Sequence, residues 1–181
     1  MKKLMIAALV LCSTGNLFAQ KYMTRTGKVT FFSSTPVENI EAFNNEVASV
    51  VDAKTGDVVF QVPIKSFKFE KALMQDHFNE NYMESDKFPK AEFKGKIADL
   101  SGVNFAKDGT YNVKINGKLT IHGVTKDVSM PGTIVVKGSS ITASSKFNVA
   151  TADYNINVPK VVEGKIAKQI EVTVNTVLNQ K

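Results

Sequence analysis

Apolar and polar residues alternate along much of this sequence, and few folds accommodate such a pattern. In the clearest segment, apolar residues fall on odd numbers from 111 to 121, and Asn, Lys or Thr holds the positions between them. Strand side chains point alternately to opposite faces, so this spacing predicts a β-strand with one apolar face. Gly117 falls in the apolar row, as expected where a strongly bent strand needs a residue without a side chain.

The same alternation recurs over residues 58–64, 128–136, 141–149 and 170–174. Shorter strands are predicted at 28–32, 46–52 and 91–100. The apolar phase slips after Ile64, which indicates a β-bulge near Lys65–Ser66. Turn residues such as Gly56-Asp57 and His122-Gly123 separate consecutive segments, so neighbouring strands are expected to pair in antiparallel fashion.

About eight strands with one apolar face must hide that face, either by closing into a barrel or by packing as a sandwich. Long strands with glycines in the apolar row favour the barrel. The periodicity therefore predicts an all-β fold, an antiparallel β-barrel of about eight strands with one or two short helices.

Two segments depart from the alternation and are predicted to be helical. Residues 36–43 begin with a proline, which is favoured in the first turn of a helix. Residues 73–83 place Leu73, Met74, His77, Phe78 and Tyr82 on one side at helical spacing. This apolar side is expected either to pack into the core or to form a lid over one end of the barrel.

The first nineteen residues have the pattern of a secretory signal peptide. Two lysines precede a short apolar stretch, and Ala19 is a small residue just before the predicted cleavage site. Cleavage there leaves residues 20–181 as one domain in the periplasm or outside the cell, and it removes Cys12, the only cysteine. The alternative is a lipid anchor on Cys12, which the bulky Leu11 before it disfavours.

The chain carries a net charge of +6, which loss of the two leader lysines would lower to +4. Its lysines are dispersed rather than grouped in a stripe, so nucleic acid is not predicted as a partner. Dispersed positive charge is typical of a soluble surface, and transient contact with anionic lipid head groups at a membrane is the alternative interpretation.

The residues that usually carry catalysis are sparse. His77 follows Asp76, but helical neighbours point about 100° apart and do not form a ready catalytic pair. His77 is therefore predicted to be structural or to contact a ligand head group, and His122 to be structural in a turn. The sequence has no nucleophile elbow, phosphate loop or closely spaced pair of metal ligands, so we predict no enzyme activity, no metal site and no cofactor.

Two blocks of the sequence form recognisable motifs. Residues 74–95 contain an aspartate-histidine pair and then an aromatic-proline pair that leads into a strand, in Asp76, His77, Phe88, Pro89 and Phe93. Residues 117–126 are Gly-Lys-Leu-Thr-Ile-His-Gly-Val-Thr-Lys. Both blocks resemble motifs of the YceI-like polyisoprenoid-binding family. The resemblance implies an exported, lipocalin-like antiparallel eight-stranded β-barrel, with an elongated apolar cavity for an isoprenoid or other long-chain lipid.

The apolar row mixes aromatic side chains with small residues, and this mixture is expected to leave a groove inside the barrel. The small residues are Gly95, Gly117, Gly132 and Ala143. Burial of a hydrocarbon chain releases about 0.8 kcal/mol per CH2 group, so an isoprenoid or acyl tail needs no polar contact to bind. The predicted ligand contacts are Phe31, Phe60, Phe67, His77, Phe78, Tyr82, Phe93, Tyr111, Val113, Ile115, Leu119, Ile121 and Phe147.

These observations predict an exported lipid-binding barrel that is not an enzyme. Two alternatives stay open at this point. One is an enzyme that acts on a small amide or lipid in the same cavity, which requires a carboxylate close to His77. The other is a filled barrel that serves as a stress-response or interaction module, which requires an interior without a pocket.

Overall fold

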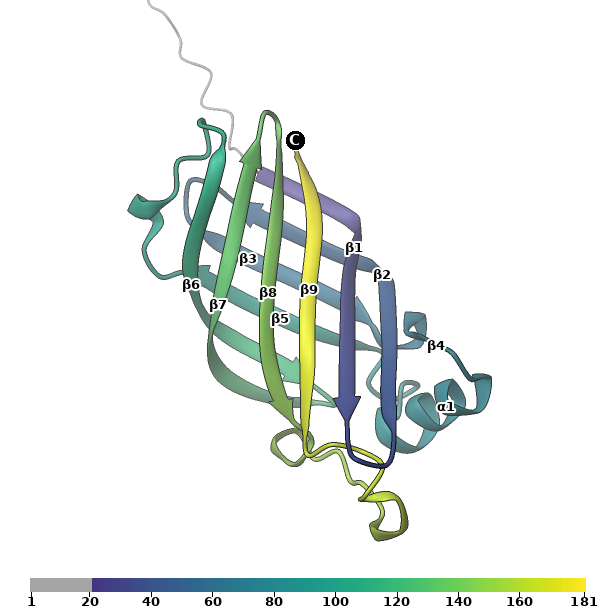
Figure 1. The fold of residues 1–181 in the computed structure, drawn as a ribbon. Helices are drawn as coiled ribbons and strands as arrows, with labels where there is room; N and C mark the ends of the chain where they lie inside the picture. Colours follow the sequence, from purple (N-terminus) through teal and green to yellow (C-terminus); the bar gives the residue numbers. More distant parts are fainter. Residues whose placement is uncertain (1–20) are drawn as a thin grey trace, which may run out of the picture.

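Residues 21–181, which the computed structural model describes, fold into a closed antiparallel β-barrel (Figure 1). Eight long strands follow the order β1-β9-β8-β7-β6-β5-β3-β2, and pairing of β1 with β2 closes the sheet on itself. This confirms the predicted all-β barrel, whereas the predicted leader lies outside the described residues. The strands are β1 (Lys21–Ser34), β2 (Asn39–Asp52), β3 (Asp57–Pro63), the two-residue β4 (Lys68–Phe69), β5 (Lys90–Ile97), β6 (Gly109–Ile121), β7 (Val124–Lys137), β8 (Ser140–Ala150) and β9 (Gln169–Gln180).

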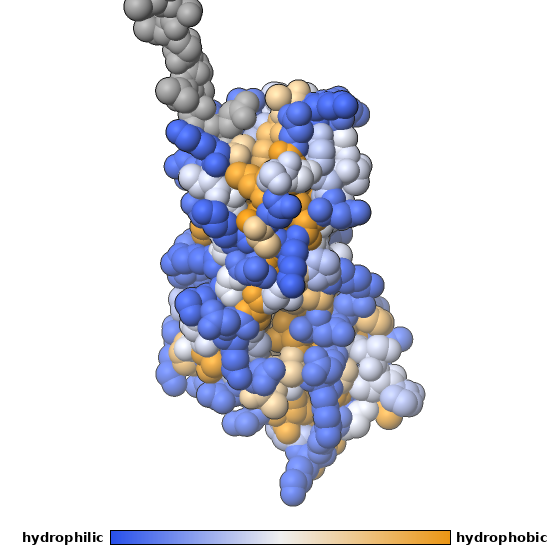
Figure 2. Space-filling view, turned by 90° about the vertical axis from the view of Figure 1, so that its left-hand side faces the viewer, coloured by the Kyte–Doolittle hydropathy of each residue, from blue (hydrophilic) through white to orange (hydrophobic). Residues whose placement is uncertain are grey.

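The alternation in the sequence corresponds to the two faces of the barrel wall. Along β6, Asn112, Lys114, Asn116 and Lys118 are exposed, and the residues between them are buried or half-buried. Hydrophilic residues cover most of the side seen in Figure 2, with a discontinuous strip of hydrophobic residues down its middle. Closure of the sheet thus removes most of the apolar face from water, which is the main favourable contribution to folding.

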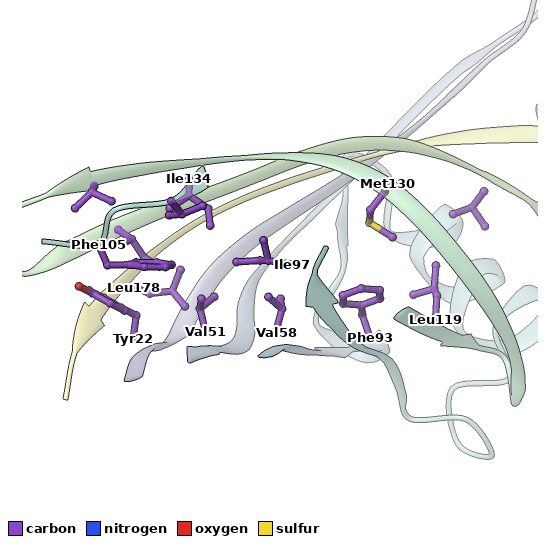
Figure 3. Close-up of a cluster of buried hydrophobic side chains, with 14 of the residues drawn as sticks. Tyr22, Val51, Val58, Phe93, Ile97, Phe105, Leu119, Met130, Ile134 and Leu178 are labelled. Atoms are coloured by element: carbon purple, nitrogen blue, oxygen red, sulfur yellow. The ribbon is translucent and has the colours of Figure 1, made fainter. Parts of the chain in front are cut away.

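One end of the barrel is filled by its own side chains. Tyr22 stacks on Phe105 with ring centroids 5.8 Å apart, and Leu178 is fully buried in the same cluster (Figure 3). Phe105 comes from the loop between β5 and β6, and its ring points into the barrel. Phe93, Leu119 and Met130 lie toward the other end in Figure 3. The filled end leaves the opposite end as the place where a ligand can be admitted.

The wall curves along β6 (Figure 1), and β5 and β6 pair Gly95 with Gly117. A Cβ atom on Gly117 would lie 2.5 Å from the Cα atom of Gly95 and 2.5 Å from the carbonyl oxygen of Lys94, closer than any ordinary contact. The structure confirms that the backbones approach too closely at Gly117 for a side chain to fit.

Residues 36–43 are not helical, so this sequence prediction is wrong. They form a turn and the start of β2, and the hairpin pairs Ser34 with Asn39. The Thr35 hydroxyl accepts a hydrogen bond from the Glu38 N–H and donates one to the Glu38 carbonyl, both at 3.0 Å. A side chain that forms hydrogen bonds with the backbone groups of a turn stabilises a hairpin at the expense of a helix.

The second predicted helix, at residues 73–83, is present in two parts. The first, α1 (Ala72–His77), is α-helical, and η2 (Phe78–Tyr82) is a π-helical turn of the kind often found at functional sites. The phase slip after Ile64 comes from a 3₁₀ turn, η1 (Ile64–Ser66), rather than from the predicted β-bulge. Among residues 21–181, no helix has the length and apolar character needed to cross a membrane.

Candidate ligand-binding cavity

The barrel encloses a cavity of about 560 Å³, which side chains from all eight long strands line. Small-molecule sites in proteins typically occupy about 300–1,000 Å³, so the volume suits a ligand. The lining is predominantly apolar. Its polar and charged members are Ser33, Glu38, Lys71, His77, Tyr82, Glu92, Thr133, Ser144, Ser145, Thr151 and Lys165. The filled-barrel alternative required an interior without a pocket, and this cavity contradicts it.

Most of the residues predicted from the sequence as ligand contacts lie on the cavity wall. These are Phe31, Phe60, Phe67, His77, Phe78, Tyr82, Phe93, Ile115, Leu119, Ile121 and Phe147. The structure therefore brings together side chains from five strands, a turn and the helical segment. That each of them contacts a bound ligand stays a prediction.

Tyr111 and Val113 are the two predicted contacts that do not line the cavity. Both lie in the first part of β6, which starts at the filled end of the barrel. The Tyr111 hydroxyl donates a hydrogen bond to the Lys107 carbonyl at 2.9 Å, which directs this side chain toward the loop between β5 and β6. The period-two pattern identifies the inner face correctly but does not show how far along that face the cavity extends.

A further part of the wall was missed from the sequence, in the segment between β8 and β9. Ile156, Val158, Val162 and Ile166 of this segment line the cavity. The Ala167 N–H donates to the Ser33 hydroxyl at 2.8 Å, which ties the segment to the end of β1. These apolar residues follow neither a strand nor a helix period, so their concentration in a long connection was the only available signal.

The helical segment contributes its apolar side to the cavity, and Phe78 anchors it to the barrel. The Phe78 ring lies 5.4 Å from Phe31, 5.5 Å from Phe67 and 5.1 Å from Phe69, measured between centroids. Aromatic pairs at such distances contribute about 0.5–1.5 kcal/mol each beyond simple burial. The expected packing of this segment is confirmed, because Phe78 lies in an aromatic cluster and also lines the cavity. A lid role for the segment stays a prediction.

The open end, here called the mouth, lies between α1, the β1–β2 turn and the segment before β9 (Figure 1). Leu73 and His77 line the cavity and yet are exposed, so the cavity reaches solvent at this end. The Lys71 ammonium lies 3.9 Å from the Glu38 carboxylate and links the helix to the turn. Lys165, in the segment before β9, also lines the cavity here, so the mouth carries charged groups.

The inward glycines do not leave the groove that the sequence led us to expect. A Cβ atom on Gly95 would collide with the Phe93 ring, and one on Gly132 would lie 2.8 Å from the Ile115 methyl group. Neighbouring side chains fold over these glycines and use the space themselves, because close packing is favoured inside a protein. Of the four small residues, only Ala143 lines the cavity.

His122 connects the two sequence blocks that carry the family resemblance. Its Nε2 atom lies 2.8 Å from the Glu84 carboxylate, and its ring meets Phe88 edge-on at 4.6 Å. Its Nδ1 atom lies 3.2 Å from the Tyr154 carbonyl oxygen. The backbone φ of His122 is +49° and that of Gly123 is +74°, as a tight β-hairpin turn requires. His122 is therefore structural, as predicted.

The other predicted chemistry rests on His77, which lines the cavity and whose imidazole makes no hydrogen bond or ion pair with residues 21–181. Among these residues, no carboxylate makes the direct contact with His77 that would support the enzyme alternative. Within the same residues, no three His, Cys, Asp or Glu side chains are grouped as a metal site. What the arrangement can do is bury apolar surface, at about 0.8 kcal/mol per CH2 group.

Comparison with known proteins gives one family and several similar folds. A family model described as a YceI-like domain matches residues 19–178. Proteins with curated functions yield no match. A polyisoprenoid binding domain from Saccharophagus degradans, implicated in plant cell wall breakdown, has a TM-score of 0.75 and 14% identity, and the alignment covers 91% of this chain and 100% of that one.

Two further solved structures are similar. BcnA from Burkholderia cenocepacia has a TM-score of 0.71 and 19% identity, with 83% of this chain and 95% of that one covered. The YCEI protein of Campylobacter jejuni has a TM-score of 0.63 and 17% identity, with 98% and 99% covered. At these identities the likeness is one of fold, which agrees with the lipocalin-like eight-stranded barrel expected from the sequence.

Proposed function

The chain belongs to the YceI-like domain family, and from this premise we propose that it is an exported lipid-binding protein. It holds the hydrocarbon chain of an isoprenoid or another long lipid in the barrel cavity, and it does so without chemical conversion of the ligand. The polyisoprenoid binding domain among the similar structures supports this ligand class.

The cavity is the observation that carries the proposal. It measures about 560 Å³, opens at the mouth and has a wall made mostly of aliphatic and aromatic side chains. A hydrocarbon chain gains about 0.8 kcal/mol for each CH2 group that leaves water, so ten such groups would contribute about 8 kcal/mol before the costs of binding. A wall of this composition has no comparable advantage for a small polar ligand.

The test is to identify what the protein carries and what it accepts. Native mass spectrometry of gently purified protein is expected to show adducts heavier than the polypeptide, which organic extraction releases as lipid. The extracted protein should then bind all-trans-retinol, a C20 isoprenoid alcohol whose fluorescence rises in an apolar site. Only the bare polypeptide mass, together with no uptake of retinol, would contradict the proposal.

Export is a separate part of the proposal, and it has its own test. It rests on the leader-like residues 1–19 and on a family match that begins at residue 19. In the native host, the mature protein is expected in the periplasm or the medium, with a mass that corresponds to a chain starting at Gln20. Recovery of the intact chain from the cytoplasm would contradict export and leave lipid binding unaffected.

A further inference from the structure

The barrel wall has a break between β7 and β8. Their pairing runs from Lys137 with Ser140 to Thr133 with Ser144 and then stops. Residues 124–132 of β7 continue to pair with β6, and residues 145–150 of β8 continue to pair with β9. In Figure 1, β7 curves away from β8 over this stretch. Within residues 21–181, two strand edges thus face each other here with no strand between them.

The break has a cause in the sequence. The N–H and C=O of a strand residue point to the same side, and the Ser145 hydroxyl donates to the Pro131 carbonyl at 2.6 Å, so this side of Pro131 faces β8. Proline has no N–H, so the ladder lacks a donor where the pairing ends. The curve of β6 carries β7, which stays paired with it, away from β8 (Figure 1).

The cavity reaches the outer face at this break. Ala143, Ser145 and Phe147, which face inward, line it together with Thr133 and Ser144, which face outward. The outward position of Thr133 is shown by its hydroxyl, which lies 3.2 Å from Oδ1 of Asn112 on the exposed face of β6. A cavity lined by both faces at a break in pairing passes through the wall. We call this opening the side window.

The lower edge of the side window is closed by a 3₁₀ turn, η4 (Thr151–Tyr154), which follows β8 directly. The Lys126 ammonium of β7 lies 3.5 Å from Asp153, and His122 Nδ1 lies 3.2 Å from the Tyr154 carbonyl oxygen. These two contacts hold η4 against the other side of the break. The side window therefore has defined limits and is not a frayed strand end.

The side window and the mouth differ in charge. The cavity residues at the window are hydroxyl-bearing and neutral, namely Thr133, Ser144, Ser145 and Thr151. The strand edges add backbone N–H and C=O groups that no strand satisfies. Beside it, the ammonium groups of Lys126 and Lys146 are paired with Asp153 and Glu171, at 3.5 Å and 2.9 Å. A neutral polar group finds hydrogen-bond partners there, whereas an anion would lose hydration and would meet two ammonium groups that carboxylates already neutralise.

We propose that the side window binds the uncharged polar end of the ligand, such as a hydroxyl, ester or ketone group, while the hydrocarbon chain lies in the cavity. This inference rests on the proposed function, since it assigns a place to one end of the same lipid. It also gives the barrel two openings, a charged mouth and a neutral side window.

The test compares two ligands with the same chain and different ends. All-trans-retinol ends in a hydroxyl and all-trans-retinoic acid in a carboxylate, and retinol is expected to bind at least about tenfold more tightly to the wild type. Ser144→Lys places a cation at the side window and should shift this ratio toward retinoic acid by about fivefold. Thr142→Lys, two residues along the outer face and within the paired part of β8, should leave the ratio unchanged.

An unchanged ratio in Ser144→Lys, or the same shift in Thr142→Lys, would overturn the inference. Circular dichroism establishes that each variant folds, and Thr133→Lys replaces Ser144→Lys if the latter does not. Failure of every variant and of the wild type to bind either ligand, with only the bare polypeptide mass in native mass spectrometry, would overturn the proposed function as well. Binding of both ligands with no effect of the lysine would overturn the side window alone.

Discussion

The Nε2 atom of His122 lies 2.8 Å from Oε2 of Glu84, although 38 residues separate the two in the chain. The imidazole thereby joins the β6–β7 turn to the segment after the helix, and its other nitrogen reaches the Tyr154 carbonyl of η4. Three segments at one end of the barrel are thus held by a single, largely buried side chain.

Replacement of this imidazole is expected to destabilise the barrel. His122→Ala removes both contacts and the Phe88 packing and should lower the free energy of unfolding by about 1–3 kcal/mol. Denaturant unfolding followed by circular dichroism measures this. Lys118→Ala in the same hairpin removes only an exposed ion pair with Asp127, at 2.9 Å, and should cost less than about 1 kcal/mol. Equal losses in the two variants would contradict a structural role for His122.

The close approach of the backbones at Gly117 predicts a large cost for any side chain at that position. Gly117→Val should destabilise by more than about 2 kcal/mol, because the new Cβ would meet backbone atoms of Gly95 and Lys94 that cannot move aside. Gly102 offers a matched control, since a Cβ atom there meets nothing within 4 Å. Gly102→Ala is expected to change stability by less than about 1 kcal/mol. A well-tolerated Gly117→Val would show that the backbones are not in close contact.

The cavity predicts that a large side chain at Ala143 fits and displaces the ligand. In a packed core, Ala143→Phe would cost about 1–3 kcal/mol, whereas beside a cavity it should cost less than about 1 kcal/mol. Retinol binding should weaken at least about tenfold. Thr142→Phe, on the outer face of the same strand, should leave binding unchanged. Strong destabilisation by Ala143→Phe, with retinol binding retained, would indicate a filled interior.

The aromatic contacts of Phe78 predict that the helical segment loosens without this ring. Phe78→Ala should raise the rate of amide hydrogen exchange over residues 72–82 and speed the dissociation of retinol, because Phe78 is in contact with Phe31, Phe67 and Phe69. Leu73→Ala serves as the control, since Leu73 is 65% exposed and contributes little packing. Faster exchange in both variants would mean that Phe78 is not the anchor.

The carboxylate of Glu92 is expected to make the free energy of unfolding depend on pH. Hydrogen bonds from Lys94 and then Gln61 lower the pKa of Glu92 below its ordinary value, against the opposing effect of burial. The carboxylate therefore stabilises the fold fully above the pKa it has when unfolded, about 4.3, and this contribution is lost as pH falls through the lower folded pKa. Glu92→Gln should cost about 0.5–1 kcal/mol at pH 7 and nothing at low pH. An equal difference at pH 3 and pH 7, measured by urea unfolding, would contradict this assignment.

The sequence by itself determined the barrel and its inner face. Period-two alternation is a local property of each strand, so it placed Phe93, Leu119 and Phe147 on the inside without knowledge of their neighbours. It also marked Gly117 as a position that excludes a side chain. The helical spacing around Phe78 was equally local, and it placed the apolar side of that segment correctly.

Only the tertiary structure decided where the cavity is and where it opens. Tyr111 and Phe93 look alike in the sequence, yet one lies toward the filled end, next to the loop that carries Phe105, and the other lines the cavity. Residues 36–43 form a turn and a strand because the Thr35 hydroxyl makes hydrogen bonds with the backbone of Glu38. The space beside the inward glycines is occupied by the side chains of Phe93 and Ile115. The end of the β7–β8 pairing beside Pro131 depends on how far β7 curves away from β8. Each of these outcomes depends on contacts between residues distant in the chain, which local periodicity does not encode.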